Sequence, residues 1–183
     1  MDKTTKKNAA AYDATVEQFD QRTKELEEPE QAIRGDFMAL LRKNGSILDI
    51  GCGPGRDAHI FTDGGFRVVG IDVAPKMIEK AKTIAPKAEF HVMDMFRLGF
   101  KEGSFDGIWF NAGLLCIPKI QALPLLKRIK QILNDKGIVW ISVKEGQSEG
   151  FEIDKRYNTE KYFAYYSQDE LAEVVKKAGF GTN

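Results

Sequence analysis

The stretch SILDIGCGPGRDAHIF, residues 46–61, begins as an apolar, β-branched segment and then becomes rich in glycine. Three glycines fall at positions 51, 53 and 55. A buried strand that runs into bare backbone and then a helix predicts a turn at which another molecule can approach the main chain closely. The free N–H groups at the start of the following helix favour negatively polarised ligand groups. A tight turn with no ligand is the alternative interpretation.

Strand and helix patterns alternate along the rest of the chain. Apolar segments typical of buried strands occupy residues 46–50, 67–72, 88–93, 105–110 and 137–143. Helical spacing of apolar residues is found at 8–23, from Pro29 to the Asn44–Gly45 pair, and at 55–63, 75–85, 120–133 and 167–178. Such alternation predicts an α/β fold, doubly wound, with a mostly parallel sheet and helices on both faces.

We expect one domain over residues 1–183, with four parts. Residues 1–44 would form N-terminal lid helices, and residues 45–146 the core that binds a ligand. Residues 147–166 mix charges with aromatic rings and predict an irregular loop. Residues 167–183 hold the last helix, which opens with the capping-box sequence SQDE and ends at Gly179.

The composition excludes several classes of protein. Apolar residues make up 43% and charged residues 30%, and 27 basic residues balance 27 acidic ones. The zero net charge argues against long-range attraction to nucleic acid or an anionic membrane. No apolar run approaches the ~20 residues that span a bilayer, and the N-terminus lacks a signal sequence. Two cysteines without CxxC spacing and two histidines predict neither a disulfide framework nor a metal site, and favour the cytoplasm.

Three acidic residues lie at or near the ends of successive predicted strands. Asp49 lies in an otherwise apolar strand, where its charge requires a partner such as a cationic ligand group. Asp72 comes 21 residues after Gly51, the spacing at which a carboxylate binds both hydroxyls of a ribose. Asp94 lies between Met93 and Met95, and a carboxylate beside thioethers suits an adenine. Each acid alone has a helix cap or a turn as its alternative, but together they indicate an adenosine with a cationic tail.

The order of these motifs resembles that of the class I S-adenosylmethionine-dependent methyltransferases. The resemblance rests on ILDIGCGPGRD, VVGIDVAPKMIEKAK, AEFHVMDMF, FDGIWFNAGLLCIP and LLKRIKQILNDKGIVWISVKEG, and it runs from about residue 46 to 146. It implies a Rossmann-like fold, S-adenosylmethionine as the cofactor, and methyl transfer as the activity. In this fold two more strands follow the last helix, and here the chain stops at AGFGTN. We therefore expect two of the usual seven strands to be missing, and either a truncated chain or a homodimer through the uncovered sheet edge.

The resemblance also implies a role for each site residue. Gly51, Cys52 and Gly53 would line the methionine part, with Asp49 and the Asn111 carbonyl at the ammonium. Asp72 would bind the ribose, Val73 and Met77 would border the adenosine, and Asp94 and Met95 the adenine.

Three further residues have two interpretations each. Arg56 is either a bidentate donor to the cofactor carboxylate or a solvated arginine at a helix start. Tyr12 and Phe19 stand where relatives have a lid helix over the cofactor, and their spacing also suits core packing, which we favour for Phe19.

Other classes of protein share parts of this pattern. A nicotinamide dehydrogenase requires a glycine where this chain has Arg56, and a P-loop nucleotidase requires GK[ST] after the glycines. A cofactor-binding protein without catalysis is the alternative from another class.

The acceptor is predicted from the apolar loop after the fourth strand and from the rings of the 144–166 segment. These favour a small, apolar or aromatic molecule. A tRNA is the second candidate, for which the basic residues Lys127, Arg128 and Lys130, and Lys155, Arg156 and Lys161, would have to supply the surface. No catalytic residue is assigned, because methyl transfer from a sulfonium mainly requires alignment.

Overall fold

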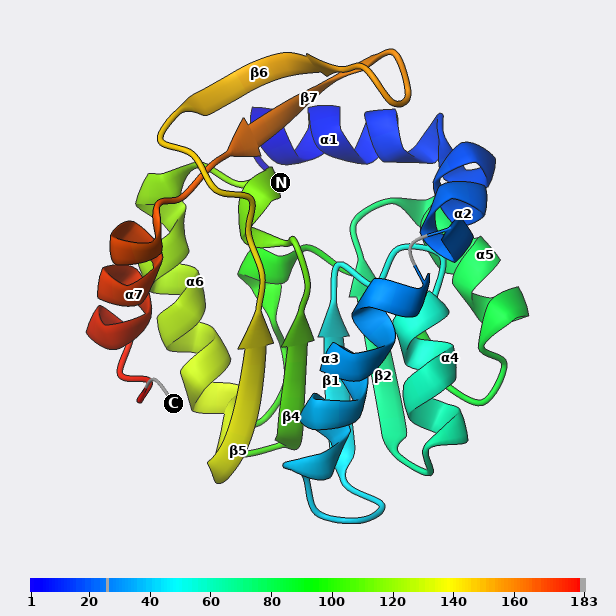
Figure 1. Ribbon diagram of the computed structural model, residues 1–183, viewed down its shortest axis with the longest axis vertical. Helices are drawn as coiled ribbons and strands as arrows, with labels where there is room; N and C mark the ends of the chain where they lie inside the picture. Colours follow the sequence, from blue (N-terminus) through cyan, green and yellow to red (C-terminus); the bar gives the residue numbers. More distant parts are fainter. Residues whose placement is uncertain (26, 182–183) are drawn as a thin grey trace.

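Five parallel strands form the central sheet of the computed structural model, which describes residues 1–25 and 27–181 (Figure 1). The strand order is β3-β2-β1-β4-β5, and the pairs are parallel throughout. The order reverses at β1, whose neighbours are β2 and β4. The bounds are β1 (Ser46–Ile50), β2 (Arg67–Asp72), β3 (Glu89–Val92), β4 (Phe105–Phe110) and β5 (Leu133–Ile141).

Helices pack against both faces of this sheet because successive strand residues point to opposite sides. Ile47 and Trp109 belong to one buried cluster with α3, α4 and α5, whereas Leu48 and Ile108 belong to the other, with α6 and α7. The predicted doubly wound α/β fold is confirmed. The bounds are α3 (Glu27–Ala39), α4 (Arg56–Asp63), α5 (Pro75–Ile84), α6 (Lys119–Ile132) and α7 (Gln168–Lys177), with short 3₁₀ turns η1 (Met95–Arg97) and η2 (Leu114–Cys116).

The N-terminal region differs from the prediction in its helix boundaries. The helix expected over residues 8–23 is two helices, α1 (Lys3–Asp13) and α2 (Val16–Glu25), separated at Ala14 and Thr15. The Thr15 hydroxyl donates to the Ala11 carbonyl at 2.9 Å, and such local hydrogen bonds compete with a continuing helix. The next helix begins at Glu27 rather than Pro29, and it ends at Ala39, before the Asn44–Gly45 pair.

The segment predicted to be an irregular loop is an antiparallel hairpin, so that prediction was wrong. Strands β6 (Glu149–Asp154) and β7 (Thr159–Ala164) pair over their full length and form a sheet of their own. Asn8 of α1 stabilises the hairpin, because its side chain accepts from the Tyr162 N–H at 2.8 Å. In Figure 1, α1 crosses above the carboxyl ends of the central strands, and the hairpin lies beyond it.

The last helix follows the prediction closely. The Ser167 hydroxyl accepts from the Glu170 N–H at 3.2 Å, and the Glu170 carboxylate accepts from the Ser167 N–H at 2.9 Å, so the capping box is formed. Gly179 follows the helix with a φ of 91°. Within the described residues, β5 has no further strand beside it in the central sheet. None of the helices in residues 1–25 and 27–181 is both long and apolar enough to cross a lipid bilayer.

Gly55→Ala should destabilise the fold by about 2–4 kcal/mol. Gly55 has a φ of 86°, and an added Cβ would lie 2.9 Å from both the Cα and the Cβ of Ala81 on α5. Urea denaturation measures the free energy of unfolding. Gly99→Ala is the control, since a Cβ there meets no atom within 4 Å. Equal stabilities for the two variants would contradict this account of the turn.

Candidate functional site

Two cavities meet at the carboxyl end of β1, where the strand order reverses. Counted together with the open solvent at their mouths, the first contains about 820 Å³ and the second about 1050 Å³ of empty space. They share a boundary of six residues: Tyr12, Phe19, Gly51, Gly53, Asn111 and Ala112. Every residue that the sequence predicted for the site lines one cavity or both. The first holds Asp72, Val73, Met77, Asp94 and Met95, and the second holds Asp49, Cys52 and Arg56.

The glycine turn forms the floor where the cavities join. Gly51 and Gly53 have φ values of 73° and 52°, in the left-handed region that favours glycine. An added Cβ at Gly51 would meet no atom within 4 Å, and one at Gly53 would meet only the Phe19 ring at 3.5 Å. The turn therefore leaves open space on its cavity side, whereas Gly55 is required for the packing of α4 on α5.

Asp72, at the end of β2, is held by the backbone around it. One carboxylate oxygen accepts from the Gly53 N–H at 3.0 Å, and the other accepts from the Ala74 N–H at 2.8 Å. Burial raises the pKa of Asp72 to about 6, against the lowering effect of these backbone donors. Each oxygen has a second lone pair, so the carboxylate can accept from two neighbouring hydroxyl groups at once.

Asp49 is a buried carboxylate with one oxygen unsatisfied. Its exposed fraction is 3%, and Oδ2 has no hydrogen-bond partner within the described residues. Burial raises the pKa of Asp49 well above its usual range, and the charges of Asp57 and Asp72 add to the effect. An unpaired buried carboxylate is costly, and a cationic ligand group would provide the missing partner.

Asp94 both caps a turn and lines a cavity, which are the two roles that the sequence allowed for it. Its Oδ1 accepts from the Phe96 N–H at 3.0 Å and thereby caps the η1 turn. The same residue lines the first cavity, together with Met93 and Met95.

Arg56 belongs to an ion-pair network that the sequence did not reveal. Its guanidinium contacts Glu30 and donates to Asp57 at 2.9 Å. Asp57 also accepts from Arg34 at 3.0 Å and from the indole N–H of Trp109 at 2.8 Å. Arg34 and Trp109 are both almost fully buried. Arg56 is therefore oriented by acids at the cavity wall, and the interpretation as a solvated arginine is wrong.

Ser142, which directly follows β5, holds the loop after β4, and the sequence did not predict this role. The Ser142 hydroxyl donates to the Asn111 side chain and accepts from the Ala112 N–H at 2.8 Å. Ala112 has a φ of 57°, which costs free energy for a residue with a Cβ. Ser142 thus keeps a strained loop in place between the two cavities.

The comparisons with known proteins agree with this geometry. Residues 47–137 match a family model described as a methyltransferase domain. The 2-methyl-6-phytyl-1,4-hydroquinone methyltransferase of Synechocystis sp. is 40% identical over 35% of this chain and 21% of the relative. The 18S rRNA (guanine-N(7))-methyltransferase bud23 of Schizosaccharomyces pombe is 33% identical over 73% of this chain and 48% of the relative. The chain belongs to the class I S-adenosylmethionine-dependent methyltransferases.

The fold of this methyltransferase is similar to that of a solved complex of DhpI with SAH. The TM-score is 0.78 at 16% identity, over 96% of this chain and 87% of that one. S-adenosylmethionine is the cofactor of the family. The chain spans about half or less of the length of the curated relatives above.

Aromatic rings form a roof over the methyltransferase's two cavities. Tyr12 and Phe19 meet edge to face with centroids 5.8 Å apart, and Phe19 stacks on Tyr157 of the hairpin turn at 5.9 Å. Phe19, for which we favoured core packing, packs against the buried cluster of Val16, Ala74 and Met77 and also lines both cavities. Tyr157 and Phe163 are the hairpin rings that line the second cavity, whereas Tyr162 and Tyr166 are buried in the core.

A buried ion pair supports this roof. Lys161, 1% exposed, lies with its ammonium 4.2 Å from the ring centroids of both Tyr12 and Tyr157, and 3.4 Å from the Asp154 carboxylate. The contacts are cation–π interactions in a site from which water is largely excluded. Lys161 therefore joins the hairpin to α1 through the rings.

The affinity for 5′-methylthioadenosine should rise as the pH is raised through a midpoint of about 6 and level off above it. This nucleoside carries the ribose hydroxyls but no ammonium. A protonated Asp72 can accept fewer hydroxyl hydrogen bonds, so affinity should fall about tenfold per pH unit below the midpoint. Calorimetric titration between pH 4.5 and 8 measures the dissociation constant.

Asp72→Asn should bind the nucleoside weakly with no such pH dependence. Asp63→Asn is the matched control, because Asp63 lies outside both cavities on α4 and pairs with Lys87. A wild-type affinity that is flat across this pH range would show that the Asp72 carboxylate does not contact the ribose.

Proposed function

We propose that this protein transfers the methyl group of S-adenosylmethionine to a small organic molecule with an apolar or aromatic body. The observation that carries the proposal is the pair of cavities that meet at Gly51, Gly53 and Asn111. One cavity has the acids and thioethers that suit an adenosine, and the other has a wall of rings. The boundary between them is where a methyl group would pass from cofactor to acceptor.

The first cavity suits the nucleoside part of the cofactor. Asp72 would accept from the ribose hydroxyls, and Asp94 would accept from the exocyclic amine of the adenine. Val73, Met77 and Met95 line the same cavity and would pack on the apolar faces of the nucleoside. The acidic acceptors and the apolar lining both suit this group.

The methionine part would lie over the glycine turn. Asp49, with its unsatisfied oxygen, would bind the ammonium, and the Asn111 backbone carbonyl would accept from it. Gly51, Cys52 and Gly53 would allow close approach to the backbone. Arg56, held in orientation by Glu30 and Asp57, would face the carboxylate.

The residues of this chain contribute alignment and exclusion of water. S-adenosylmethionine supplies a methyl group on a sulfonium, which a nucleophile displaces in line. Tyr12, Phe19 and Tyr157 would cover the junction and keep water from it, and the strained loop at Ala112 would fix its width. We assign no general base, because the need for one depends on the acceptor.

An RNA acceptor is the second candidate, since one relative is an rRNA methyltransferase. The side chains argue against it. Arg156 and Lys161 are paired with Asp154, and Arg128 donates to the carbonyls of Leu98 and Phe100. Three of the six basic side chains are therefore engaged within the chain, which reduces the open basic surface available to RNA. Pairing of two chains through the outer edge of β5 remains part of the proposal.

Asp49→Asn should weaken the binding of S-adenosylhomocysteine by about 10–100-fold and leave that of 5′-methylthioadenosine unchanged. S-adenosylhomocysteine has the ammonium that Asp49 would bind, whereas 5′-methylthioadenosine lacks it. Calorimetry with both ligands separates a lost contact from a damaged fold. An equal loss for the two ligands would show that Asp49 acts on the fold rather than on the ammonium.

The same calorimetry tests the function itself, with NAD as the competing ligand. Binding of NAD without binding of S-adenosylhomocysteine would overturn the proposal. Filter binding of bulk tRNA at 50 and 200 mM salt separates the acceptor classes, because RNA contacts through phosphates weaken steeply with salt. We expect no salt-dependent retention, and strong retention at low salt would favour the RNA acceptor.

A further inference from the structure

The second cavity is lined by an unusual number of charged side chains. The cations come from α2, α4, the end of β5 and the hairpin turn, and the acids come from α3, β1 and α4. The cations are Arg22, Arg56, Lys144 and Arg156, and the acids are Glu30, Asp49 and Asp57.

Two of the cations are compensated by acids of the chain. Arg56 is paired with Glu30 and Asp57. Arg156 forms a bidentate pair with Asp154, with its Nε 2.7 Å from Oδ1 and a terminal nitrogen 2.8 Å from Oδ2. Bidentate pairs of this kind fix the guanidinium and satisfy its charge.

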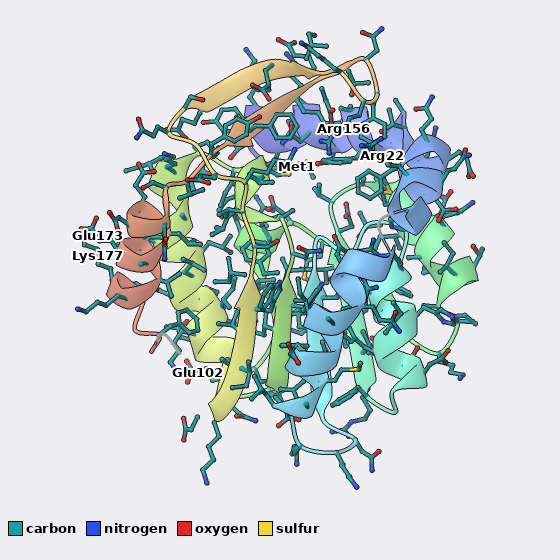
Figure 2. All side chains as sticks on the ribbon, viewed as in Figure 1. Met1, Arg22, Glu102, Arg156, Glu173 and Lys177 are labelled. Carbon is teal, nitrogen blue, oxygen red and sulfur yellow. The ribbon has the colours of Figure 1, made fainter. Side chains whose placement is uncertain are left out.

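The other two cations form no ion pair with an acid among the described residues. Lys144 follows β5, and its ammonium lies 5.4 Å from the centroid of the Phe163 ring. Partial burial and the charge of Arg156 lower the pKa of Lys144, against the smaller raising effect of Asp154 and Glu152. Arg22 lies on the exposed side of α2 and lines the same cavity. Figure 2 shows Arg22 of α2 and Arg156 of the hairpin turn near each other in this view, and both line the cavity.

The proposed cofactor does not use these two charges. Its ammonium would take Asp49, and its carboxylate would face Arg56. Lys144 and Arg22 are then left positive beside a wall formed by the Phe163 and Tyr157 rings and Leu115. A cavity with an apolar wall and uncompensated cations suits a ligand with an apolar body and one anionic group.

We propose that the methyl acceptor is a small carboxylate with an apolar body, and that Lys144 binds its carboxylate. The inference rests on the proposed function and specifies the acceptor class at that site. Phe163, Tyr157 and Leu115 would pack on the apolar body, and Arg22 would add charge at the opening. Lys144 is then the residue that selects anionic acceptors over neutral ones.

The test uses the full chain saturated with S-adenosylhomocysteine. Ligand-observed NMR screens a panel of aromatic and aliphatic monocarboxylates, including benzoate, phenylacetate, cinnamate and hexanoate, beside their primary amides. Carboxylates should bind at least tenfold more tightly than the matched amides. Lys144→Met should remove this preference, and Lys144→Arg should retain it. Lys136→Met, an exposed lysine at the other end of β5, should behave as the wild type.

Four outcomes would overturn the inference. The first is equal binding of carboxylates and amides, and the second is no binding of either. The third is unchanged carboxylate binding in Lys144→Met. The fourth is a loss of S-adenosylhomocysteine binding in Lys144→Met as large as the loss of carboxylate binding, in which case Lys144 binds the cofactor's own carboxylate. Calorimetry of S-adenosylhomocysteine with the wild type and each variant separates a failure of the proposed function from a failure of the acceptor class. If the wild type does not bind S-adenosylhomocysteine, the proposed function is refuted. If it binds S-adenosylhomocysteine but shows no preference for carboxylates, only the acceptor class is refuted.

Discussion

The reversal of strand order at β1 is the constraint on which the site depends. β1 pairs with β2 on one side and with β4 on the other, so the connection after β1 runs toward one edge of the sheet and the connection after β4 runs toward the other. A cleft opens where the connections diverge, beyond the carboxyl end of β1. Because parallel strands end at the same edge, Asp49, Asp72 and Asp94 all lie at this cleft. No local feature of any one strand would bring them together.

The cleft holds negative charge that the chain only partly compensates. Asp72 is satisfied by two backbone N–H groups, yet burial still raises its pKa. Asp49 lacks even this compensation at one oxygen. By contrast, the Asp57 carboxylate is held by Arg34, Arg56 and Trp109. The difference indicates which acids support the fold and which remain available to a ligand.

The roof depends on contacts between segments that are far apart in sequence. Asn8 of α1 bonds with the backbone of Tyr162, and its amide also donates to the Cys116 carbonyl at 3.1 Å. The hairpin buries Lys161 against Asp154 and between two rings. An ion pair buried in this way is costly to break, because removal of one partner leaves an uncompensated charge. The hairpin and α1 therefore act as one cover over both cavities.

The sequence alone determined the central sheet, the glycine turn and those cavity residues that lie at the ends of the strands. These are local signals: the period of apolar residues, the capping box of α7 and the acids at the strand ends were all read from neighbouring positions. Only the tertiary structure decided the hairpin, because the buried charges of Asp154 and Lys161 obscure the alternation of a strand until their pairing is known. The same is true of the Arg34–Asp57–Trp109 network and of Ser142 behind the Asn111 loop. Their partners lie 23 to 52 residues away, and such contacts follow from the packing of helices and strands rather than from any short stretch of sequence.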